Sequence, residues 1–154
     1  MAYNWVWTSK YLLVIIIALS LGSVIGDMAL FKQTALGTPK MTAAALVKFI
    51  SYAGALYFLW LLGQNAAKQF RSAGDRTAFL GFVLVPLVTF VIVSAAYTVG
   101  LVVLRPFLTG TIKGAYNWLF ILAITGAAIY LVIALFNHGE SFMALFKSGS
   151  RKIT

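Results

Sequence analysis

The ionisable side chains are the first candidates for chemistry, and few of them are acids. The chain has three carboxylates, Asp27, Asp75 and Glu140, against twelve Lys and Arg residues, and a single histidine, His138. Acid–base catalysis needs positioned proton donors and acceptors, and a metal site needs several ligands in one place. The spacing provides neither, and the motifs HExxH, GxSxG and GxxxxGK[ST] do not occur. We therefore expect a protein that is not an enzyme, with no catalytic residue, no metal and no cofactor.

Three charged residues flank long apolar runs. Asp27 follows the first run, Lys48 directly precedes the second, and Arg105 follows the third. If the runs cross a membrane, all three residues lie in the same leaflet, where an ion pair of Asp27 with Lys48 or Arg105 would lower the cost of charge near hydrocarbon. No charged residue lies near the middle of a run. The pattern therefore favours a structural ion pair or snorkelling side chains over an ion or proton pathway.

His138 allows one redox hypothesis. A histidine near a helix end can ligate a haem iron or border a quinone, although bis-histidine ligation would need a second histidine from a partner. The alternative is an interfacial turn residue in the sequence Asn137-His138-Gly139, and the pattern favours this second interpretation.

These residues belong to a chain that composition assigns to the membrane. Its 154 residues are 62% hydrophobic and only 10% charged, and the mean hydropathy is +0.95. Soluble domains carry about 25% charged residues. The net charge of +9 is spread singly between apolar runs, so we interpret it as a topology signal that meets anionic lipid headgroups and not as a nucleic-acid surface.

The uncharged runs 11–26, 49–67, 77–104 and 114–139 predict four membrane-spanning helices. The predicted fold class is an all-α integral membrane protein, a single domain over 1–154 with its helices in a small bundle. The expected helices cover approximately 8–30, 43–65, 77–104 and 115–137. We expect the third to be kinked near Pro86, because proline removes a backbone hydrogen bond. The sequence of 140–147 predicts a short interfacial helix.

Small residues recur at helical spacing on three of these segments. Residues four apart share a helix face, and small side chains let helix backbones approach closely. The pattern predicts packing faces, either inside the bundle or against another subunit, at Ala18, Gly22, Gly26, Ala96, Gly100, Ala123 and Ala127.

Orientation follows from the distribution of Lys and Arg. With four spans both termini share one side, which carries Lys10, Lys68, Arg71, Arg76, Lys147, Arg151 and Lys152. The other side carries Lys32, Lys40, Lys48, Arg105 and Lys113. The excess of seven Lys and Arg residues over five favours cytoplasmic termini in a prokaryotic inner (cytoplasmic) membrane.

Short loops, small-residue faces and the lack of a catalytic constellation predict a non-catalytic accessory or structural subunit of a larger membrane complex. Its expected partners are other membrane subunits and the anionic bilayer. One alternative is a homo-oligomeric channel, pore or transporter subunit with the third helix beside the path. A second is the membrane anchor of a redox complex, with His138 near a haem or quinone.

Overall fold

The computed structural model describes residues 6–37, 41–73 and 75–139, with residues 75–77 described by their backbone. This part of the chain is mostly helical, and four helices in it are long and apolar enough to cross a membrane. They are α1 (Val6–Asp27), α3 (Ala43–Ser72), α4 (Asp75–Leu104) and α5 (Gly110–Asn137). The 22 residues of α1, the shortest, make about 33 Å at about 1.5 Å per residue, which suffices for a hydrocarbon core of about 30 Å. The predicted multi-pass membrane protein with four long helices is confirmed.

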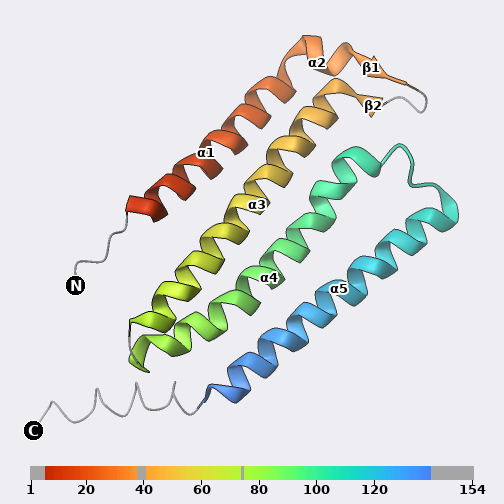
Figure 1. Cartoon of the computed structure of the whole chain (residues 1–154). Coiled ribbons are helices and arrows are strands. Elements are labelled where there is room, and N and C mark those ends of the chain that lie inside the picture. Colours follow the sequence, from red (N-terminus) through yellow and green to blue (C-terminus); the bar gives the residue numbers. More distant parts are fainter. Residues whose placement is uncertain (1–5, 38–40, 74, 140–154) are drawn as a thin grey trace, which may run out of the picture.

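The four long helices lie side by side in a row, in the order of the chain (Figure 1). Each helix packs extensively only against its neighbour in the row: α1 against α3, α3 against α4, and α4 against α5. Short connections explain this antiparallel order. We call the end of the row where α1 and α4 finish the hairpin end, and the end where α1 begins and α5 finishes the opposite end. The bundle is thus a single layer of helices.

Small residues occupy the seams between neighbouring helices. The buried positions of α1 are Gly22 and Gly26, and a side-chain carbon added at Gly22 would overlap the side chain of Ser51 on α3. Between α3 and α4, a carbon added at Gly81 would lie 2.6 Å from the carbonyl oxygen of Ala67. The seams are therefore close because these positions have little or no side chain.

The connection between α1 and α3 is more regular than the short loop expected between the first two predicted helices. It contains the short helix α2 (Ala29–Gln33) and a two-stranded antiparallel hairpin of β1 (Ala35–Leu36) and β2 (Met41–Thr42). Thr42 then caps α3, because its hydroxyl oxygen accepts a hydrogen bond from the backbone nitrogen of Ala45 at 3.2 Å. Strands of two residues leave almost no alternation for a sequence pattern to show, which is why the hairpin was missed.

Helix boundaries also differ from the sequence expectation. α3 continues to Ser72 instead of ending near 65, because Ala67 and Arg71 still pack against Gly81 at the start of α4. α5 begins at Gly110 instead of near 115. Pro86 is fully buried inside α4, and the kink expected there stays a prediction. The expected interfacial helix over 140–147 lies outside the described residues.

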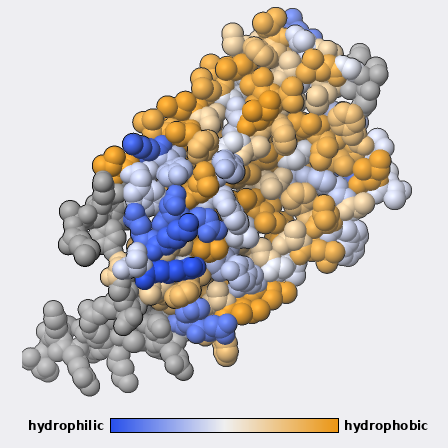
Figure 2. All heavy atoms as spheres, viewed as in Figure 1, coloured by the Kyte–Doolittle hydropathy of each residue, from blue (hydrophilic) through white to orange (hydrophobic). Residues whose placement is uncertain are grey.

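Hydrophobic side chains cover most of the molecular face shown in Figure 2, and hydrophilic residues gather mainly near the opposite end. Large apolar side chains are exposed along all four long helices, and Phe136 on α5 is 85% exposed. Lipid would cover such a surface in a bilayer.

Candidate functional site

Two groups of cations lie at the hairpin end, and they differ in their surroundings. The first surrounds Asp27, the last residue of α1. The Lys48 ammonium nitrogen on α3 lies 2.9 Å from Asp27 Oδ1, and that of Lys32 on α2 lies 3.2 Å from the same oxygen. This Asp27 cluster joins three helices by ion pairs. The carboxylate and both lysines remain accessible, and ion pairs of that kind add little to stability.

Gly26 makes the Asp27 cluster possible. A side-chain carbon at this position would lie 2.6 Å from two carbons of the Lys48 side chain. The lysine therefore passes directly over the glycine to reach the carboxylate. The sequence predicted an ion pair of Asp27 with either Lys48 or Arg105. In the structure Asp27 pairs with Lys48 and also with Lys32. Arg105 lines a separate cleft.

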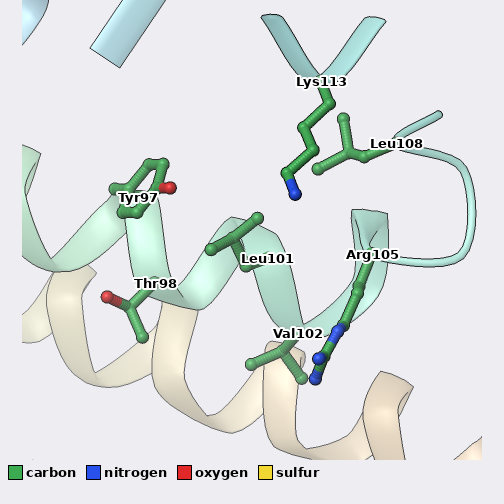
Figure 3. A pocket seen from close by; sticks show the side chains of 7 residues that line it. All are labelled: Tyr97, Thr98, Leu101, Val102, Arg105, Leu108 and Lys113. Carbon is green, nitrogen blue, oxygen red and sulfur yellow. The ribbon is translucent and has the colours of Figure 1, made fainter. Parts of the chain in front are cut away.

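The second group of cations lines a cleft between α4 and α5 with a volume of about 510 Å³. Arg105, directly after α4, and Lys113, in the first turn of α5, contribute the charges. Figure 3 shows the Lys113 side chain extending from α5 toward α4, and the Arg105 side chain lying beside Val102. The described residues that line this α4–α5 cleft are Tyr97, Thr98, Leu101, Val102, Arg105, Leu108 and Lys113. None of these seven is a carboxylate.

A polar and aromatic contact holds α4 and α5 together on the side of the cleft that is further from the hairpin end. The Tyr116 hydroxyl donates a hydrogen bond to the backbone carbonyl of Tyr97 at 2.7 Å, and the Tyr97 hydroxyl donates to Oδ1 of Asn117 at 3.2 Å. Phe120 packs on both tyrosine rings, with ring centroids 4.8 and 5.5 Å away. Gly100 leaves room for the Tyr116 hydroxyl, which a side chain would displace. This contact fixes the two walls of the cleft relative to each other.

The other small residues singled out in the sequence have mixed positions. Ala127 is buried, Ala18 and Ala96 are partly buried, and Ala123 is exposed on α5. The structure thus brings Gly22 and Gly26 against α3 and Gly100 against α5, and leaves Ala123 facing outward.

His138 lies at the opposite end of the molecule. Its Nδ1 is 3.0 Å from the Ala134 carbonyl oxygen, which accepts a hydrogen bond when Nδ1 carries the proton. The imidazole stacks on Phe82 of α4 at 4.4 Å between centroids, and the Arg71 guanidinium lies 4.7 Å from the centre of the Phe82 ring. Arg71 also donates a hydrogen bond to the Gly81 carbonyl at 3.2 Å. These contacts tie the ends of α3, α4 and α5 together.

No group of three or more potential metal-ligating side chains occurs in the part of the chain that the structure describes. Sequence reasoning missed Lys113, Tyr97 and Leu108 as members of one cleft. The available signal was that Arg105 and Lys113 bracket a short connection and fall on the same side of the membrane.

Comparisons with protein-family models, with curated proteins and with solved structures find no match for the chain.

Proposed function

We propose that this protein is a non-catalytic accessory or structural subunit of a larger prokaryotic inner-membrane complex. The observation that carries the proposal is the single-layer arrangement of the helices. Each long helix packs extensively only against its neighbours in the row, so α1 and α5 each have one long helix as a neighbour. Both edges and both faces of the layer are open to lipid or to other membrane helices.

The outward surface of α5 is the best candidate for a subunit contact. A side-chain carbon added at Gly126 would meet nothing within 4 Å, and the neighbouring Ala123 and Thr125 are also exposed. Small side chains let helices approach closely, and a threonine hydroxyl can donate a hydrogen bond across such a contact. We propose that a partner helix packs on this α5 surface.

Charge distribution supports the orientation that we propose for the complex. Seven Lys and Arg residues on the side of the termini, against five on the side of the hairpin end, favour cytoplasmic termini. We further propose that α4 is kinked at Pro86, since proline cannot donate the usual backbone hydrogen bond.

Gentle extraction from the native membrane tests the proposal. The full chain is solubilised in mild detergent, purified, and analysed by native mass spectrometry. Co-purification with unlike membrane chains supports an accessory subunit. A stable lone monomer contradicts it, and a colourless complex of identical chains favours the pore alternative.

Two glycine variants locate the contact. Gly126→Leu on α5 should lower the recovery of partner chains about tenfold or more. Gly54→Leu is the matched control, because a carbon at Gly54 on α3 also meets nothing within 4 Å. If both variants retain the partners equally well, the contact does not lie on the Gly126 surface of α5.

A further inference from the structure

The α4–α5 cleft presents two cations without a counter-charge. Asp27 is already bound by Lys32 and Lys48, and neither Arg105 nor Lys113 has an ion-pair partner among the residues that the structure describes. Both side chains are exposed, and both line the same cleft. Such a site attracts an anion from outside the protein.

The local backbone adds to this attraction. α5 begins beside the cleft at Gly110, and its cap residue Thr109 makes no side-chain capping hydrogen bond. The amino end of a helix therefore contributes a further partial positive charge. At the end of α4, the carbonyls of Leu101 and Leu104 already accept hydrogen bonds from the backbone of 105–108, which offsets part of the negative end of that helix.

The rest of the lining is apolar and follows the membrane-spanning part of α4. Leu101, Val102 and Leu108 line the cleft beside the cations. Tyr97 lies eight residues before Arg105 on the same helix, a distance of about 12 Å along its axis. The cleft thus leads from a cationic mouth at the end of an apolar span toward the hydrocarbon region. A volume of about 510 Å³ is also much larger than a phosphate group alone requires.

From this arrangement we propose that the α4–α5 cleft is a binding site for an anionic phospholipid. The phosphate lies at the mouth of the cleft, where the Lys113 ammonium reaches it from α5 and the exposed Arg105 side chain turns from its place beside Val102 to donate charge-assisted hydrogen bonds to it. The upper part of an acyl chain lies against Leu101 and Val102. Two sources share this phosphate chemistry, a lipid headgroup and free phosphate, and the apolar lining favours the lipid.

Native mass spectrometry of the full chain in detergent micelles tests the site. Micelles contain equal amounts of phosphatidylglycerol and phosphatidylcholine with identical acyl chains. The wild type should retain phosphatidylglycerol in preference to phosphatidylcholine. Arg105→Gln and Lys113→Gln should each lower phosphatidylglycerol retention about fivefold, and the double variant about 25-fold, from the usual effect of one cation near an anionic headgroup.

Matched variants separate a built site from general attraction. Lys68→Gln removes an exposed cation of α3 at the opposite end and should leave retention unchanged. Lys113→Arg keeps the charge and should keep the lipid. Thr98→Phe fills the cleft without changing any charge and should lower retention, provided that circular dichroism shows the helices intact.

Three outcomes overturn the proposal. The first is equal retention of the two lipids, and the second is an equal loss in Lys68→Gln and Lys113→Gln. The third comes from adding inorganic phosphate to delipidated protein. If phosphate binds in a manner that depends on Arg105 and Lys113 while phosphatidylglycerol is not retained, the cleft is a site for small anions instead.

Discussion

At the hairpin end, the cations of the α1–α3 half are paired with a carboxylate, whereas the cations of the α4–α5 half are not. Among the described residues, each half places two cations there: Lys32 and Lys48 in the first, Arg105 and Lys113 in the second. In the first half Asp27 lies between the cations, and the seam beneath them is closed by glycine. In the second half the helices leave a cleft, and none of the described residues that line it is a carboxylate. Cations that share a carboxylate join helices, whereas cations without a counter-charge are left to bind a ligand.

The largest effect is expected in the α1–α3 seam. Gly22→Leu should lower the free energy of unfolding by about 1–3 kcal/mol, because the new side chain overlaps Ser51 and forces α1 away from α3. Loss of helical circular dichroism during titration with sodium dodecyl sulfate measures this. Gly126→Leu enters open space on α5 and should change the value by less than about 0.5 kcal/mol. Equal effects of the two variants would show that the first seam is not close-packed.

A smaller effect is expected in the α4–α5 seam. Tyr116→Phe removes the hydrogen bond to the Tyr97 carbonyl and should lower the free energy of unfolding by about 1 kcal/mol. It should also increase proteolysis of the connection over 105–109, since the two helices are held together just beside it. Tyr57→Phe, at an exposed tyrosine of α3, is the control and should have no such effect. Increased cleavage in both variants would argue against a specific role of the Tyr116 hydroxyl.

The smallest change in stability is expected for Asp27→Asn, because the ion pairs of Asp27 are accessible to solvent. Its value lies in leaving cations without a counter-charge in the α1–α3 half, where the wild type has none. In a background of Arg105→Gln and Lys113→Gln, Asp27→Asn removes the one negative charge that Lys32 and Lys48 share and should raise phosphatidylglycerol retention by up to about fivefold. Native mass spectrometry measures the retention, and Asp27→Glu serves as the control. Unchanged retention would mean that a free cation alone does not attract lipid, and that the cleft supplies more than charge.

Sequence reasoning predicted the membrane class and the four long helices because apolar run length is a local property. It also named Asp27, Lys48 and Arg105 as residues of one leaflet, since topology alone decides that. It could not choose between Lys48 and Arg105 as the partner of Asp27, because the choice depends on which helices are neighbours. The row places α1 beside α3 and two positions away from α4. A bundle of a different order would bring different cations to the same carboxylate.

The cleft was harder to predict for a related reason. Arg105 and Lys113 could be recognised as neighbours across a short connection. The space between them, however, depends on how α4 packs against α5. That packing is set by Tyr97, Tyr116 and Phe120. In the sequence alone, these aromatic residues are equally consistent with a position at the membrane interface. The hairpin of β1 and β2 was missed because each strand has only two residues.

The order of helices in the row has a consequence for biogenesis. Every extensive contact between long helices joins segments that are consecutive in the chain. Proteins with such local contacts have a low contact order and fold quickly, since no long loop must close before a contact forms. Each new helix can therefore dock on the previous one as it leaves the ribosome, without waiting for the next. Synthesis and assembly can proceed in step from α1 to α5, which receives its only long-helix neighbour from what has already been made.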